Sequence, residues 1–97
     1  MITDEIKLPI TQAGLRKILR DHGVVKAQLF GSYARGQQTQ NSDIDLLVAY
    51  KPGTSYFDHL DLQKLLEEKS GVRVDLVSKL HPSFKPYIEP ELIDLAV

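Results

Sequence analysis

The chain contains no cysteine, no apolar run of membrane-spanning length and no excess of basic residues. Without cysteine it can form neither disulfides nor thiolate metal sites, and this composition suits a reducing compartment such as the cytoplasm. No apolar run approaches the about 18 residues that suggest a membrane span, so we expect no membrane contact. The formal net charge of −1 argues against a surface for long nucleic acids, which usually require a basic track.

The length and composition predict a single domain over residues 1–97. Hydrophobic residues make up 42% of the chain and charged residues 26%, which is ordinary for a globular protein with a modest core. The opening segment, MITDEIKLPI, is acidic and is interrupted by Pro9, unlike a signal peptide.

Hydrophobic spacing predicts the order helix, strand, strand, helix, strand, helix. The elements are a helix after Thr11, strands at 24–30, 43–50 and 72–77, a helix from about 56 to 69, and a short helix near 83–88. The longer helix is expected to bury Phe57, Leu60, Leu65 and Leu66. The strand 43–50 is apolar on both faces after its acids, which indicates that it is covered on both sides or nearly so. Together these elements predict an α/β (α+β) fold with helices packed on a small mixed sheet.

Three acidic residues are placed so that they could converge. Asp43 and Asp45 lie two residues apart on one strand and therefore share a face, and Asp75 points outward from the strand 72–77. If these strands are neighbours, the uncompensated cluster is costly, and a divalent cation would turn the repulsion into binding energy. Hard oxygen ligands of this kind suit Mg²⁺. The ordinary alternative is that D-x-D near a strand end is exposed and carries no ion.

The segment GSYARG, residues 31–36, supplies a complementary site for an anion. Gly31 ends the first strand, and Ser32 opens a helical turn whose free backbone N–H groups can bind a phosphate. Gly31 allows close approach to the backbone, and Arg35 adds a fixed positive charge. A Gly-Ser turn alone is a weak signal. Combined with the acids that follow it, the turn predicts a site for a nucleoside triphosphate with Mg²⁺.

The segments GSYARG and SDIDLLV resemble the signature GS-x-x-x-G…D-x-D of the DNA polymerase β-type nucleotidyltransferase superfamily. Together with PGTSYFDHLDLQKLLEE and GVRVDLV, they resemble the small prokaryotic branch of that superfamily, the minimal nucleotidyltransferases (MNT), over about residues 15–78. The resemblance implies a polymerase β-like nucleotidyltransferase fold. The tail departs from the branch at Pro86 and Pro90, where relatives often have a smoother helix.

The resemblance also implies residue roles. Gly31 and Ser32 match the positions that hold the triphosphate of ATP, and Asp43 and Asp45 match the two carboxylates that bridge two Mg²⁺ ions. Asp75 matches the third carboxylate, which binds the catalytic ion.

Arg35 matches a common position near the phosphates. Catalysis would then transfer AMP from ATP to a hydroxyl group and release pyrophosphate.

Members of this branch commonly accompany a helical HEPN-domain protein, often an RNase toxin. The resemblance therefore implies a Mg²⁺-dependent antitoxin that transfers AMP to a hydroxyl, expected to be a tyrosine, of a HEPN toxin. Two alternatives stay open: an antitoxin that neutralises its partner by binding alone, and a nucleotidyltransferase with a small-molecule or RNA acceptor. The residues do not identify the acceptor, the base preference or the oligomeric state.

Overall fold

A four-stranded mixed sheet forms the centre of the protein, with strand order β3-β2-β1-β4. The computed structural model describes residues 7–97, so most of the acidic opening segment lies outside the described residues. Strand β1 is antiparallel to β2 and β4, whereas β2 and β3 are parallel. The strands are β1 (Val24–Phe30), β2 (Ile44–Tyr50), β3 (Val74–Val77) and β4 (Ile93–Leu95). The predicted mixed sheet with packed helices is confirmed.

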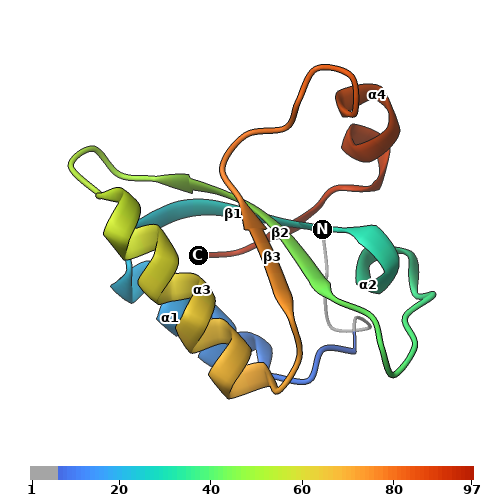
Figure 1. The fold of residues 1–97 in the computed structure, drawn as a ribbon, viewed down its shortest axis with the longest axis horizontal. Coiled ribbons are helices and arrows are strands. Elements are labelled where there is room, and N and C mark those ends of the chain that lie inside the picture. The colour runs from blue at the N-terminus through green and yellow to red at the C-terminus, as the bar shows by residue number, and fades with distance from the viewer. Residues whose placement is uncertain (1–6) are drawn as a thin grey trace.

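Two longer helices, α1 (Gln12–Asp21) and α3 (Tyr56–Ser70), lie together beside the sheet (Figure 1). The short helix α2 (Gly31–Arg35) follows β1 without a break, and α4 (Lys85–Ile88) with the 3₁₀ turn η1 (Glu89–Glu91) leads into β4. In Figure 1, α2 and α4 lie away from the pair formed by α1 and α3. No helix within residues 7–97 is long and apolar enough to cross a membrane.

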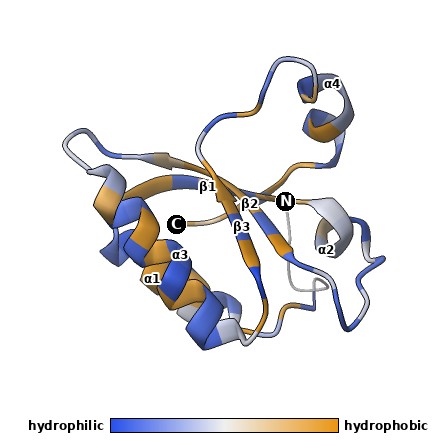
Figure 2. Cartoon of the chain, in the orientation of Figure 1, coloured by the Kyte–Doolittle hydropathy of each residue, from blue (hydrophilic) through white to orange (hydrophobic). Residues whose placement is uncertain are grey.

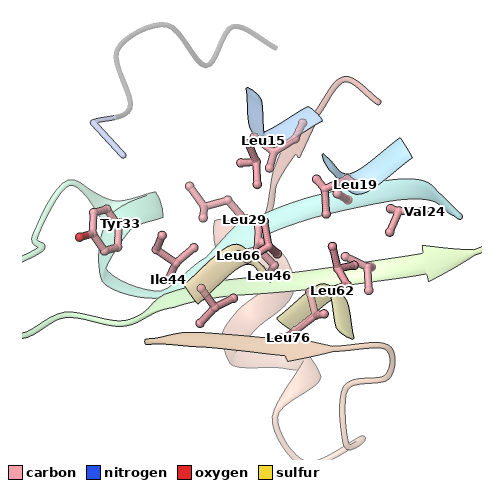
Figure 3. Close-up of a cluster of buried hydrophobic side chains, with 14 residues drawn as sticks. Leu15, Leu19, Val24, Leu29, Tyr33, Ile44, Leu46, Leu62, Leu66 and Leu76 are labelled. Atoms are coloured by element: carbon pink, nitrogen blue, oxygen red, sulfur yellow. The ribbon is translucent and has the colours of Figure 1, made fainter. Parts of the chain in front are cut away.

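The core lies between the sheet and the pair of longer helices. Leu19 of α1 and Leu62 of α3 are fully buried in the same cluster as Leu29 and Leu46 of the sheet (Figure 3). Burial of such side chains is the main stabilising contribution in a domain of this size. The loop between α2 and β2 is hydrophilic (Figure 2).

The second face of the sheet is open, which corrects the expectation that β2 is covered on both sides. Ile44, Leu46 and Val48 are buried, but Leu47 is only half-buried and Ala49 is exposed. The cause is that both longer helices pack on the same face. The face that carries Leu47 is called the open face below.

The buried stripe of α3 also differs from the prediction. Phe57 is 75% exposed and Leu60 is 43% exposed, whereas Leu62 and Leu66 are buried. At about 100° per residue, Phe57 and Leu60 lie about 140–160° around the helix from Leu62. Of the four residues expected to be buried, Leu66 is buried and Leu65 is half-buried, whereas Phe57 and Leu60 lie on the opposite side of the helix from the sheet.

This assignment predicts that two leucines of α3 differ in their effect on stability. Leu62→Ala should lower the free energy of unfolding by about 2–5 kcal/mol, because it opens a cavity in the core. The matched control Leu60→Ala removes the same atoms from an exposed position and should change it by about 0.5 kcal/mol or less. Chemical denaturation of both variants measures the difference, and equal losses would contradict the observed helix orientation.

Candidate functional site

Gly31 turns the chain directly over the carboxylate of Asp45. Its φ is +79°, a conformation that side-chain-bearing residues rarely adopt. A Cβ built on Gly31 would lie 2.9 Å from Cγ of Asp45 and would overlap its Oδ2. Both the backbone conformation and the lack of room for a Cβ therefore require glycine at this position, where the backbone packs directly against the side chain of Asp45.

Helix α2 is anchored to the core by Tyr33, whose side chain is 8% exposed and belongs to the core cluster (Figure 3). This anchor leaves Ser32, the preceding residue, half-buried beside Gly31. The helix ends at Gly36, whose φ is +70°. The burial of Tyr33 thus fixes the five-residue helix against the core.

Strand pairing brings two of the predicted acids side by side. In the parallel register of β2 and β3, Asp45 is aligned with Asp75, and on its other side Asp45 pairs with Phe30 of β1. The condition set in the sequence analysis, that the two strands are neighbours, is therefore met for Asp45 and Asp75. Because aligned residues on adjacent strands share a face, both carboxylates belong to the open face.

Asp43 lies just before β2, and its carboxylate is near the guanidinium of Arg73. Its Oδ2 is 3.9 Å from Nε of Arg73, an exposed pair that contributes little to stability. The loop before it is closed by Ser42, whose Oγ accepts a hydrogen bond from the backbone N–H of Thr39 at 2.8 Å. Asp43 is therefore positioned near Asp45 by a defined turn.

The electrostatics identify Asp45 as the most perturbed acid of this group. Its pKa is raised from 3.8 to about 6, chiefly by burial and then by the negative charges of Asp75 and Asp43. Arg35 acts in the opposite direction and favours the ionised form. A raised pKa of this origin marks a site where charges are concentrated without full compensation.

A carboxylate that the sequence reasoning missed occupies the expected anion position. Oε1 of Glu91 accepts a hydrogen bond from the backbone N–H of Gly31 at 3.0 Å, and its Oε2 lies 2.9 Å from Nη1 of Arg35. The side chain of Glu91 is only 19% exposed. Gly31 and Arg35 thus jointly bind an anion, and this anion is a carboxylate of the chain itself. No local motif in the tail could have shown this contact across 60 residues.

The donor set fits a hard divalent cation. Asp45 and Asp75 are adjacent carboxylates, and Mg²⁺ in proteins is usually bound by one or two carboxylates together with water and phosphate oxygens. Within residues 7–97, no three acidic, cysteine or histidine side chains are placed so that they could hold a metal ion together, so Asp43 does not complete a three-carboxylate group with Asp45 and Asp75. The residues present therefore suit an ion whose remaining ligands come from a substrate or from water.

Comparison with known proteins agrees with this geometry. A family model described as "Nucleotidyltransferase domain" matches residues 13–96. A Methanocaldococcus jannaschii protein named "Putative protein adenylyltransferase MJ0435" is 44% identical over 80 residues, which cover 80% of this chain and 86% of that protein.

Solved structures show the same fold. The one described as "Structure of putative minimal nucleotidyltransferase" has a TM-score of 0.74 and 39% identity, and the match covers 84% of this chain and 86% of that chain. Another, "Crystal structure of the toxin-antitoxin with AMP-PNP", has a TM-score of 0.62 and 33% identity, covering 70% of this chain and 56% of that one.

The family match spans most of the chain, including the Gly31 turn and all three acids. The solved minimal nucleotidyltransferase structure matches 84% of this chain and 86% of its own. The protein therefore belongs to the nucleotidyltransferase domain family, and within it to the minimal nucleotidyltransferases.

Proposed function

We propose that the protein is a Mg²⁺-dependent adenylyltransferase that transfers AMP from ATP to a hydroxyl group of a partner toxin, and so acts as its antitoxin. The observation that carries the proposal is the alignment of Asp45 with Asp75 directly beside the Gly31 turn. The names of the relatives support the reaction class, and the toxin–antitoxin complex with AMP-PNP supports a toxin partner and a nucleotide substrate. The HEPN identity of the toxin and its tyrosine acceptor rest on the resemblance of the sequence.

In this reaction the residues of the chain divide into two groups. The backbone N–H of Gly31, the hydroxyl of Ser32 and the guanidinium of Arg35 would hold the β- and γ-phosphates. The carboxylates of Asp43, Asp45 and Asp75 would hold two Mg²⁺ ions. When bound, these ions supply charge neutralisation at the α-phosphate and the leaving oxygen.

The reaction itself is a displacement at the α-phosphorus. The acceptor oxygen forms a bond to the α-phosphorus, the bond to the bridging oxygen breaks, and pyrophosphate leaves with that electron pair. The acceptor proton passes to a carboxylate of the acidic group, for which Asp75 is the candidate, and from there to water. The chain's contribution is mainly positioning and electrostatic stabilisation.

A second candidate function is an antitoxin that acts by binding alone. The exposed aromatic side chains of Tyr56, Phe57, Phe84 and Tyr87 favour it, because such residues are enriched at protein interfaces. An enzyme with a small-molecule or RNA acceptor is a further alternative.

The function is tested by measuring the mass of the partner. The purified chain, ATP, Mg²⁺ and the product of the adjacent gene are incubated, and the partner should gain one or more AMP units by intact mass. Asp45→Asn should reduce the rate by at least about 10²-fold, because it removes a cation ligand. Asp61→Asn, an equal charge change on an exposed helix position, should leave the rate unchanged.

The two antitoxin hypotheses separate in a growth assay. If Asp45→Asn still neutralises the toxin fully and wild type adds no mass to it, binding alone is the mechanism. If a small molecule or RNA gains AMP instead, the proposal that the acceptor is a protein is wrong, and the proposal of a nucleotidyltransferase reaction is kept.

Glu91 generates a prediction about nucleotide affinity. ATP phosphates must replace its carboxylate on Gly31 and Arg35, so the internal contact competes with the ligand. Glu91→Gln removes the charge and should tighten binding of AMP-PNP by about three- to tenfold, measured by calorimetry. The control Glu89→Gln changes the same charge at an exposed neighbour and should have a much smaller effect. Weaker binding by Glu91→Gln would instead show that Glu91 supports the site.

The raised pKa of Asp45 generates a prediction about stability without metal. The folded state binds the proton of Asp45 more tightly than the unfolded state, because the pKa is about 6 rather than 3.8. Its stabilising contribution is therefore complete below about pH 4 and is lost as the pH rises through about 6.

Thermal unfolding in EDTA measures this loss between pH 4.5 and 7.5. Asp45→Asn should gain stability relative to wild type as the pH rises, and Asp61→Asn should show no such trend. A difference between Asp45→Asn and wild type that stays constant with pH would contradict the assignment.

A further inference from the structure

A cavity of about 560 Å³ lies on the open face of the sheet, and one of its lining residues, Leu47, is two residues after Asp45 on β2. Its floor includes Gln28 of β1 and Leu47 of β2, and residues 78–80 after β3 form one wall. Lys85 and Glu89, from α4 and η1, line it from the tail. The mechanism proposed above assigns no role to any of these residues.

The strand register places this cavity relative to the reaction. Asp45 and Leu47 are two residues apart on β2, so their side chains lie on the same face about 7 Å apart along the strand. Leu47 pairs with Gln28, and Asp45 pairs with Phe30, the residue before Gly31. Gly31, the aligned pair Asp45 and Asp75, and the cavity therefore follow one another in that order along the sheet.

This order indicates that the cavity lies on the side of the acceptor hydroxyl and not on the side of the pyrophosphate. In phosphoryl-type displacement the attacking and leaving oxygens are roughly in line on opposite sides of phosphorus. The leaving pyrophosphate would lie at Gly31 and Arg35, and the α-phosphorus at the acids. The attacking hydroxyl then arrives from the side where Leu47 and Gln28 form the cavity floor.

The lining of the cavity is basic. Lys26, Lys79 and Lys85 surround it, and Glu89 is the one acidic residue among its lining residues. Within residues 7–97, none of these three lysines forms a salt bridge. Unpaired cations at the rim of a recognition site attract acidic groups and increase association rates.

The remaining lining suits a side chain with an apolar body. Leu47, Leu80 and Leu92 are half-buried and contribute apolar walls beside the lysines. A volume of this size holds two or three side chains of a peptide segment. The cavity therefore combines apolar contact with positive charge next to the reacting atoms.

We propose that this cavity binds the acceptor segment of the partner protein, and that the segment carries its reactive hydroxyl next to acidic residues. The inference rests on the proposed function, whose acceptor it describes more closely. The apolar walls receive the body of the hydroxyl-bearing residue, and the three lysines pair with neighbouring Asp or Glu side chains. Neutralising the lysines should therefore weaken binding of the partner protein and leave binding of the nucleotide unchanged.

The test uses the double variant Lys26→Gln/Lys79→Gln in the full chain. Its KM for the partner should rise about tenfold, while its Kd for AMP-PNP stays at the wild-type value. The control Lys64→Gln/Lys69→Gln makes the same charge change on exposed positions of α3 and should leave both constants unchanged. Thermal unfolding of both variants verifies that they fold.

Mapping the modified residue gives a second, independent readout. Peptide mass spectrometry should place AMP on a hydroxyl with at least one Asp or Glu within about three residues. A Lys79→Glu variant should regain activity when that acid in the partner is changed to Lys. An acceptor without neighbouring acids, or no rescue by the exchanged charges, overturns the proposal.

The remaining outcomes separate the two proposals. If AMP-PNP affinity falls and the KM for the partner does not change, the cavity binds the nucleotide and the inference is wrong. If wild type transfers no AMP, the proposed function fails, and equilibrium binding of the partner decides the inference. If the Lys26→Gln/Lys79→Gln variant binds the partner more weakly than wild type, the cavity is a docking site even without catalysis. If it binds the partner equally well, the inference is overturned.

Discussion

The parallel pairing of β2 with β3 is the constraint on which the site depends. This register aligns Asp45 with Asp75, and a slip by one residue would turn one of the two carboxylates toward the helices. The hydrophobic alternation prevents such a slip, because Ile44 and Leu46 on β2 pair with Val74 and Leu76 on β3, and all four are buried. Core packing therefore determines where the charges meet, even though the acids contribute unfavourably to the fold.

The carboxylate of Glu91, in the tail, marks the position where Gly31 and Arg35 can bind an anion. Gly31 and Arg35 bind a carboxylate that comes from η1, which shows that the backbone turn and the guanidinium can act on one anion together. The Arg35 side of this ion pair is 45% exposed, so a ligand of higher charge can reach the contact and compete for it. The same short segment also contributes Glu89 and Leu92 to the cavity on the open face. Residues 89–92 therefore touch both ends of the proposed reaction path.

Local patterns predicted most of the regular structure. The first strand was expected at 24–30 and is found there, and the limits of β2 and α3 differ from the prediction by one residue. These segments have strong periodicity or a clear cap, such as the Ser55–Asp58 capping box. Strand β4 has three residues, too few to show a period, and it exists because it pairs with the edge of β1.

The site was predictable to the extent that neighbours in space are neighbours in sequence. The Gly31 turn and the D-x-D pair lie within fifteen residues of each other, and Asp75 follows from the next parallel strand. Glu91 could not be found in this way, since its contact with Gly31 depends on the path of the tail around the sheet edge. The orientation of α3 was also beyond reach, because two apolar faces of that helix are compatible with its sequence.

Strand β4 gives the tail a mechanical role. Leu92 is the one residue between Glu91 and β4, and β4 is held at the sheet edge by three paired positions on β1. A pull on the end of the chain therefore loads the three paired positions of β4 first, and it reaches the Glu91 contact only after β4 separates from β1. Tension applied after Val97 would therefore act first beside Val25, at the end of β1 that lies away from Gly31.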